Sequence, residues 1–172
     1  TATADCIPVL LYDEEHHAVA AIHAGWRGTL ARIVHKTIQE MAFTYHTDPK
    51  KLKAVIGPGI SLDHFEVGDE VYEAFEQAAF PMEEIAEQRP NAAFSVDPAE
   101  RERLAAEGNI MQPLKWHLNL PLCNRQILLH CGVAEEHIQD CGICTFAHSD
   151  EYFSARKLGI ESGRIYTGIL LK

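Results

Sequence analysis

The 172-residue sequence lacks any apolar run close to the roughly 20 residues that a helix needs to cross a bilayer. It also lacks a secretory signal, which joins a basic segment, an apolar segment and a small-residue cleavage site. Basic residues are few: 15 lysines and arginines stand against 25 aspartates and glutamates, for a formal net charge of -10. These absences argue against a membrane span, and against nucleic acid or an anionic membrane surface as a partner. The whole excess of acidic residues lies in residues 63–107, which we interpret as a solvated helical face.

Cysteines are present in an odd number, five. Without an export signal, they are expected to be free thiols in a reducing compartment rather than a disulfide framework, with the cytoplasm as the default location. The length suits one domain with its own core. The first residue is Thr1 rather than Met, and the chain begins almost inside its most unusual motif. We therefore expect residues 1–172 to be a single domain that lacks its N-terminal portion.

Strands and helices alternate along the predicted fold. Short apolar runs predict strands, which cover residues 7–12, 17–22, 52–56, 137–144 and 163–171. Because their spacing is less regular than in a doubly wound sheet, they predict a layered α/β or α+β domain with mixed strand pairing.

Three helices are predicted between these strands. The first has Thr29 as its N-cap and ends before Asp48-Pro49, because a residue before proline disfavours helical geometry. The second is capped by Asp69, and the third runs from Asn119 to Gly132. The acidic stretch 81–117 receives no assignment.

Cys6 and His23 are the first candidates for chemistry. Cys6 precedes one predicted strand and His23 follows the next, so their distance depends on the offset between the two strands of a hairpin. Such a pair can share a zinc ion, which accepts thiolate and imidazole. Alternatively, the histidine can lower the pKa of the thiol and create a nucleophile. The structural interpretation, a buried cysteine beside a histidine in a turn, also stays open.

The segment H-A-G-W-R-G at residues 23–28 adds an anion-binding pattern. Gly25 and Gly28 lie just before a predicted helix, where backbone N–H groups can converge on an anion. Arg27 offers a bidentate partner for phosphate, and Trp26 a flat face for a base. The alternative is a tight glycine turn with a tryptophan in the core.

Three other features carry weaker signals. Cys141 and Cys144 form a single C-x-x-C, and two such positions on a strand point to different sides, so we favour structural thiols. Arg156 and Lys157 either complete an anion site or are ordinary surface charges. The remaining histidines show no paired ligand spacing and are expected on the surface or in the core: His35, His46, His64, His117, His130, His137 and His148.

Five segments occur in an order that identifies a family. They are T-A-D-C at Thr3–Cys6, H-A-G-W-R-G at His23–Gly28, I-G-P-G-I at Ile56–Ile60, C-T at Cys144–Thr145, and F-S-A-R-K at Phe153–Lys157. In this order the whole chain resembles the multicopper polyphenol oxidoreductase (laccase) domain family, which includes laccase-domain purine nucleoside phosphorylases. The resemblance implies an α/β/β/α layered sandwich with mixed sheets, similar at a distance to a cysteine-hydrolase-like deamidase fold.

The resemblance also implies an activity and a site. The activity is phosphorolysis of adenosine, inosine or methylthioadenosine to the base and ribose 1-phosphate, with adenosine deamination as a side activity. The partners are then a purine nucleoside and phosphate. Zinc would be held by Cys6 and His23 together with a histidine upstream of Thr1. The implied catalytic residues are Cys6, His23 and Arg27, and the implied phosphate and substrate contacts are Gly25, Trp26, Arg27, Gly28, Arg156 and Lys157.

Copper fits the histidine pattern poorly. Multicopper laccases build their copper centres from H-x-H and H-C-H segments, and the sequence has neither, since His130-Cys131 is followed by Gly132. We therefore expect zinc. Three alternatives stay open: a polyphenol oxidase, as the family name suggests; a cysteine hydrolase with Cys6 as nucleophile and His23 as base; and a non-catalytic nucleotide-binding domain.

Overall fold

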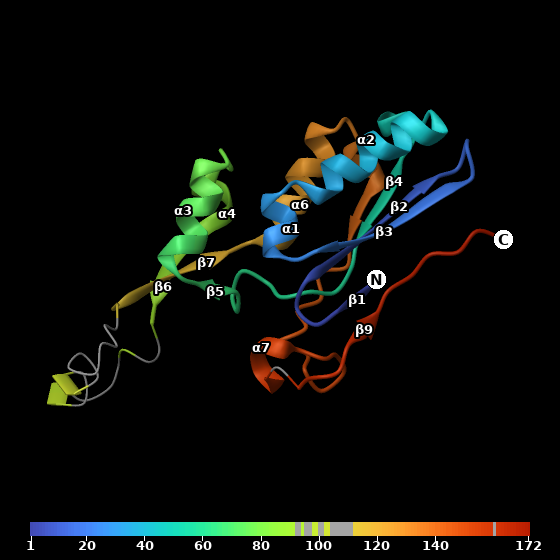
Figure 1. The fold of residues 1–172 in the computed structure, drawn as a ribbon. Coiled ribbons are helices and arrows are strands. Elements are labelled where there is room, and N and C mark those ends of the chain that lie inside the picture. Colours follow the sequence, from blue (N-terminus) through green and yellow to red (C-terminus); the bar gives the residue numbers. More distant parts are fainter. Residues whose placement is uncertain (92–93, 95–97, 100–101, 104–111, 160) are drawn as a thin grey trace.

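The structure, a computed structural model, describes residues 1–172 except 92–93, 95–97, 100–101, 104–111 and 160. Its central element is a four-stranded sheet with the order β3-β2-β4-β8 (Figure 1). The strands are β2 (Ile7–Asp13), β3 (Ala18–Ala24), β4 (Lys53–Ile56) and β8 (Ile138–Asp140). β2 pairs antiparallel with β3 and β4, whereas β4 pairs parallel with β8, so the sheet is mixed as predicted.

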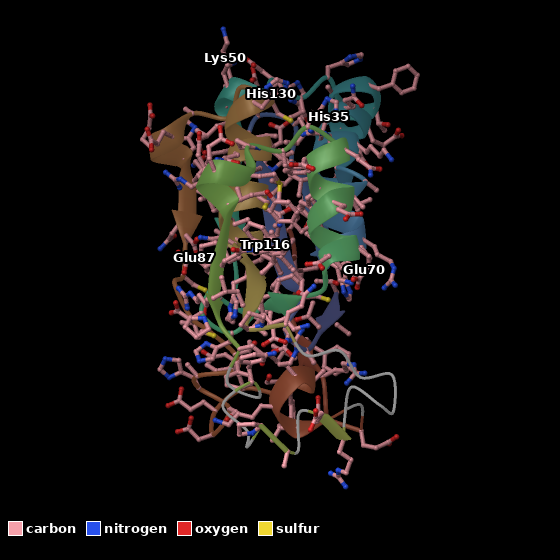
Figure 2. All side chains as sticks on the ribbon, turned by 90° about the vertical axis from the view of Figure 1, so that its left-hand side faces the viewer. His35, Lys50, Glu70, Glu87, Trp116 and His130 are labelled. Carbon is pink, nitrogen blue, oxygen red and sulfur yellow. The ribbon has the colours of Figure 1, made fainter. Side chains whose placement is uncertain are left out.

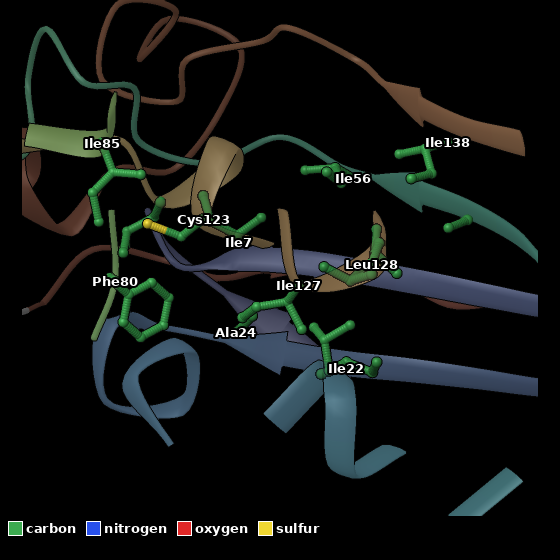
Figure 3. Packing of buried hydrophobic residues seen from close by; sticks show 14 of the residues in the cluster. Ile7, Ile22, Ala24, Ile56, Phe80, Ile85, Cys123, Ile127, Leu128 and Ile138 are labelled. Atoms are coloured by element: carbon green, nitrogen blue, oxygen red, sulfur yellow. The ribbon is translucent and has the colours of Figure 1, made fainter. Parts of the chain in front are cut away.

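Three helices cover one face of this sheet: α1 (Trp26–Leu30), α2 (Ile33–Tyr45) and α6 (Leu120–His130). Their apolar sides meet the alternating buried positions of β2, where Ile7, Val9 and Leu11 are fully buried. Figure 3 shows Ile127 and Leu128 of α6 in the same cluster as residues of β3 and β4. Burying one such side chain contributes about 1.5–3 kcal/mol, so this layer fixes how the strands and helices sit.

A second, three-stranded sheet has the order β5-β7-β6. Its strands are β5 (Glu66–Val67), β6 (Ala86–Pro90) and β7 (Leu114–Leu118), and the helices α3 (Asp69–Gln77) and α4 (Met82–Ile85) lie beside it. Tyr72 of α3 stacks on Trp116 of β7 with ring centroids 3.8 Å apart. Figure 2 looks onto this part, with Trp116 between Glu70 and Glu87.

Short elements complete the described chain. β1 (Ala2–Thr3) pairs antiparallel with β9 (Ile165–Tyr166), and α7 (Ala155–Leu158) lies near them, away from the helices that cover the four-stranded sheet. Two 3-10 turns, Pro49–Lys51 and Glu135–His137, precede β4 and β8. Among the described residues, no helix has the length and apolar character needed to cross a membrane. The prediction of a layered α/β fold with mixed sheets is confirmed.

The helix predicted to begin after Thr29 is wrong in its start and its continuity. Gly25 is the N-cap of α1, and Arg32, in the left-handed region with φ 54°, separates α1 from α2. Thr29 lies inside α1, and its buried hydroxyl donates to the carbonyl of Ala24 and accepts from the amide of Asn124. The backbone break at Arg32 ends α1 after five residues. The spacing of the apolar residues does not indicate this break.

Other boundaries also differ from the predictions. Gly68, not Asp69, is the N-cap of α3, and Asp69 occupies its first turn. The strands expected over 137–144 and 163–171 shrink to β8 and β9. The unassigned stretch 81–117 contains α4, β6 and β7 among its described residues. The predicted N-cap Asn119 is confirmed, because its side chain accepts from the N–H of Leu122.

Asp13, at the end of β2, joins this strand to the end of α2. Asp13 is 2% exposed, and its carboxylate accepts from the hydroxyl of Thr47 at 2.5 Å and from the backbone N–H groups of Glu15 and His16. Burial opposes ionisation of Asp13, but these hydrogen bonds outweigh it, so the pKa of this carboxyl lies below its ordinary value. Because the folded pKa is depressed, the ionised carboxylate stabilises the fold above the ordinary aspartate pKa.

We expect Thr47→Val to lower the free energy of unfolding at neutral pH by about 1–3 kcal/mol, because a buried carboxylate loses its hydroxyl donor. The difference in the free energy of unfolding between the variant and the wild type should shrink as the pH falls through the folded pKa of Asp13, because the carboxyl then becomes protonated in both proteins. Urea unfolding at several pH values across this range measures the difference. Thr44→Val is the matched control, since the hydroxyl of Thr44 donates to the carboxylate of Glu40 in an exposed pair. Equal effects of both substitutions at every pH would contradict the assignment.

Candidate active site

The hairpin of β2 and β3 brings Cys6 and His23 together. Its register pairs Ile7 with Ala24 and Pro8 with His23, so Cys6 lies next to Gly25. A Cβ placed on Gly25 would lie 2.7 Å from the Sγ of Cys6 and 3.6 Å from the Nε2 of His23. The thiol and the imidazole therefore converge on the space that the missing side chain of Gly25 leaves free.

The segment that follows His23 forms the first turn of α1 rather than a separate loop. Arg27 is exposed, and its guanidinium lies over the indole of Trp26, 4.1 Å from the ring centroid. Gly28 lies against the backbone, since a Cβ there would be 3.1 Å from the carbonyl oxygen of His23. The predicted anion-binding residues thus begin at Gly25, beside the Cys6–His23 pair, and the charge of Arg27 faces solvent.

Asp5 holds the loop that carries Cys6, a role that sequence reasoning missed. Its backbone adopts the left-handed region with φ 77°, and the residue is 9% exposed. One carboxylate oxygen accepts from the hydroxyl of Thr145 at 2.7 Å, and the other from the backbone N–H of Arg156 at 2.7 Å. The carbonyl of Asp5 accepts from the N–H of Ile60 at 2.8 Å. Four of the five family segments therefore meet at this residue, and its place directly before Cys6 was the signal in the sequence.

The second glycine of I-G-P-G-I, Gly59, lies where a side chain would not fit. A Cβ there would lie 2.3 Å from the Cδ1 of Ile7 and 3.1 Å from the carbonyl oxygen of Asp5. The chain after β4 therefore passes directly behind the Cys6 loop, where only glycine leaves enough room. This approach also lets Gly59 form a parallel bridge to Cys144, which extends the sheet toward Thr145.

The side chains of Arg156 and Lys157 lie in different surroundings. Arg156 lines a cavity of about 320 Å³ together with Asp5, Ile60, Phe65 and Ala155. Its guanidinium donates to the carbonyl of Glu66 at 2.9 Å. Lys157 instead lies over the ring of Phe146, with Nζ 5.2 Å from the centroid. Of the two predicted cations, only Arg156 lines the cavity beside Asp5.

The pKa of the Cys6 thiol is raised, first by burial and then by the charge of Asp5, which the charge of Arg164 opposes. The neutral thiol is therefore favoured over the thiolate unless a further positive charge stands beside the sulfur. Within the described parts of the chain, no three histidine, cysteine, aspartate or glutamate side chains form a metal-binding group. Cys6 and His23 thus form a pair of candidate ligands for a metal ion.

Cys144, predicted as a structural thiol, contacts Ser61 and His64. No spacing in the sequence joins Cys144 to Ser61 or His64, because they lie 83 and 80 positions before it. Its C-x-x-C partner Cys141 is exposed.

Comparisons with known proteins agree on one family. A family model described as multi-copper polyphenol oxidoreductase laccase matches residues 1–172. The purine nucleoside phosphorylase of Bacteroides thetaiotaomicron is 44% identical over 170 residues, which cover 99% of this chain and 55% of that protein. Adenosine deaminase RL5, from an unknown prokaryotic organism, is 39% identical over 170 residues, 99% of this chain and 56% of that protein.

Solved structures show the same likeness. YlmD from Geobacillus stearothermophilus superposes with a TM-score of 0.75 at 26% identity, covering 95% of this chain and 53% of that one. A Neisseria meningitidis protein gives a TM-score of 0.67 at 34% identity, covering 95% and 55%. The chain therefore spans little more than half the length of these relatives.

We expect Thr145→Val to lower the free energy of unfolding by about 1–3 kcal/mol, because the carboxylate of Asp5 would lose its donor in a buried place. Thr145 is itself fully buried, so no water replaces the hydroxyl at the surface. Chemical denaturation measures the change, and Thr145→Ser, which keeps the hydroxyl, is the control. A Thr145→Val protein as stable as the Thr145→Ser protein would show that this hydrogen bond does not hold the Cys6 loop.

Proposed function

Because this chain belongs to the multi-copper polyphenol oxidoreductase laccase family, we propose that it carries the site of a purine nucleoside phosphorylase. The reaction would cleave adenosine, inosine or methylthioadenosine with phosphate and release the base and ribose 1-phosphate. The observation that carries the proposal is the convergence of Cys6 and His23 beside Gly25, directly before Arg27. The name and 44% identity of the Bacteroides thetaiotaomicron relative support the same reaction.

The pair of Cys6 and His23 fits zinc by its chemistry. Zinc accepts thiolate and imidazole together, and both donor atoms face the same space at Gly25. The thiol, whose pKa burial raises, would then gain a neighbouring positive charge. When bound, zinc would act as a Lewis acid at the reacting purine nucleoside. Copper is the weaker candidate, because the sequence has no H-x-H or H-C-H segment.

Phosphate would bind beside this pair through the chain's own cations. Arg27 offers a planar fork of donors that matches two phosphate oxygens, and the indole of Trp26, 4.1 Å away, limits where the guanidinium can go. Arg156 would supply a second positive charge from the cavity beside Asp5. Phosphate held there can attack the sugar carbon that bears the base, and its own negative charge stabilises the positive charge that develops on the ribose.

Lys157 fits this role less well than its neighbour. Its ammonium lies over the ring of Phe146 rather than in the cavity beside Asp5. We keep Arg27 and Arg156 as the proposed phosphate contacts and assign no contact to Lys157.

Deamination of adenosine at the same site is a second proposed activity. It is supported by the 39% identity to the protein named adenosine deaminase RL5. Cysteine hydrolysis is less well supported, because burial and the charge of Asp5 raise the pKa of Cys6 and disfavour the thiolate nucleophile.

The deciding experiment measures metal content and inosine cleavage on one sample of the full-length protein. About one zinc per chain, with hypoxanthine released only when phosphate is present, would support the phosphorylase. Turnover that survives a chelator and stops on thiol alkylation would favour the cysteine hydrolase. Stabilisation by nucleoside without any turnover would favour the non-catalytic binding domain.

We expect Arg27→Ala to raise the KM for phosphate by about tenfold or more, because a charge-assisted pair is lost, and to leave the zinc content unchanged. Steady-state kinetics at varied phosphate and metal analysis of the same sample measure both effects. Lys36→Ala, which removes an exposed cation from the neighbouring helix α2, is the matched control. Equal loss of phosphate affinity and zinc would mean that this segment is structural.

We expect Gly25→Ala to lower zinc affinity by about tenfold or more, since the new methyl group would push the Sγ of Cys6 from its place 2.7 Å away. The flexible thiol can rotate, so the fold should survive while the ligand atom moves. Competition with a zinc-binding dye measures the affinity, and thermal unfolding monitors the fold. Gly168→Ala is the control, because nothing lies within 4 Å of the added carbon. Unchanged zinc affinity in Gly25→Ala would argue against Cys6 as a ligand.

A further inference from the structure

A second thiol, Cys144, lies in a built polar site apart from Cys6. Its Sγ accepts a hydrogen bond from the hydroxyl of Ser61 at 3.1 Å and from the backbone N–H of Ser61 at 3.4 Å. The Nδ1 of His64 lies 3.4 Å from the same sulfur and 3.3 Å from the hydroxyl of Ser61. One sulfur thus meets a hydroxyl, an amide and an imidazole, which is the set of partners that stabilises a thiolate.

The surroundings of Cys144 distinguish it from the other four cysteines. Burial opposes ionisation of Cys144, but hydrogen bonds from the Ser61 side chain and from the backbone of Ala147, Ser61 and Phe146 outweigh it, so its pKa is lowered. Burial raises the pKa of every other cysteine in the chain, and that of Cys123 to about 12. The polar contacts therefore single out the thiol at position 144.

The sulfur is reachable through a cavity. Cys144 and Ser61 line a space of about 340 Å³, whose walls include Gly57, Gly59, Asn119 and Asp140. Cys144 is only 9% exposed, so its thiol is largely covered. The cavity is the route by which a small reagent reaches it. The N-terminal end of the 11-residue helix α6, marked by its N-cap Asn119, opens on the same cavity, and its dipole favours a negative charge there.

His64 is held in position by stacking. Its ring lies on that of Phe146 with centroids 4.4 Å apart, and Lys157 covers Phe146 at 5.2 Å. The other charged groups at the cavity are the carboxylates of Asp63 and Asp140, which line its wall. The polar groups at the sulfur itself thus come from His64 and Ser61, whereas the acids lie along the wall.

We propose that Cys144, supported by Ser61 and His64, is a nucleophilic thiol and a modification site for small hydroperoxides. The thiolate attacks one peroxide oxygen, an S–O bond forms and the O–O bond breaks. The sulfur is oxidised by two electrons to a sulfenic acid, and the peroxide is reduced. The leaving group, hydroxide from hydrogen peroxide or alkoxide from an alkyl hydroperoxide, takes a proton from solvent and becomes water or the alcohol. This inference does not rest on the phosphorylase activity.

The test treats the full-length protein with hydrogen peroxide in the presence of a 1,3-dione that traps sulfenic acids, and locates the adduct by peptide mass spectrometry. We expect Cys144 to be labelled ahead of Cys141, although Cys141 is exposed and Cys144 is 9% exposed. Ser61→Ala and His64→Asn should each slow the labelling of Cys144 by about tenfold, the effect of one unit of thiol pKa. Ser61→Thr, which keeps the hydroxyl, should retain the wild-type rate.

Two results would overturn the proposal. One is labelling of Cys141 before Cys144, and the other is an unchanged rate at Cys144 in the folded Ser61→Ala and His64→Asn proteins. If those variants fail to fold, the pH dependence of alkylation by iodoacetamide in the wild type decides. Cys144 should then react with a midpoint below that of Cys141, and a midpoint at or above it would refute the assignment.

Discussion

The register of the β2–β3 hairpin controls the geometry of the candidate active site. It pairs Pro8 with His23 and so sets Cys6 beside Gly25. A slip of one residue would turn Ile7 and the other buried residues of β2 toward the opposite face of the sheet. Each of these side chains contributes about 1.5–3 kcal/mol by burial, more than the roughly 1 kcal/mol of a hydrogen bond in the site. The apolar layer, and not the site itself, therefore keeps the thiol and imidazole together.

Sequence patterns correctly predicted the strand and the helix cap that depend on residues close together in the chain. The apolar run of β2 and the cap at Asn119 are properties of neighbouring residues, so the sequence displays them. The break at Arg32 depends on a left-handed backbone conformation at an arginine, where no glycine marks the position. The second sheet has short strands, and its β6 has no fully buried residue. It is supported by stacking between Tyr72 and Trp116, 44 positions apart, which no period along the chain reveals.

The same distinction applies to the functional residues. Cys6, His23 and Arg27 were predicted as site residues because their residue types suit metal and phosphate and because their motifs are compact. The role of Asp5 was not, since its partners come from distant segments. Nor did spacing reveal the contact between Cys144 and His64. Side chains of a suitable chemical type can be proposed from the sequence, whereas the side chains that position them depend on which segments the fold brings together.

The bonds of Asp5 have a consequence for the order in which the molecule is assembled. Asp5 and Thr145 are 140 positions apart, and Asp5 and Arg156 are 151 apart. Closing loops of this length costs more conformational entropy than forming the adjacent β2–β3 hairpin, so these bonds form late in folding. During synthesis, the loop that carries Cys6 therefore lacks its hydrogen bonds to Thr145 and Arg156 until nearly the whole of this sequence has left the ribosome.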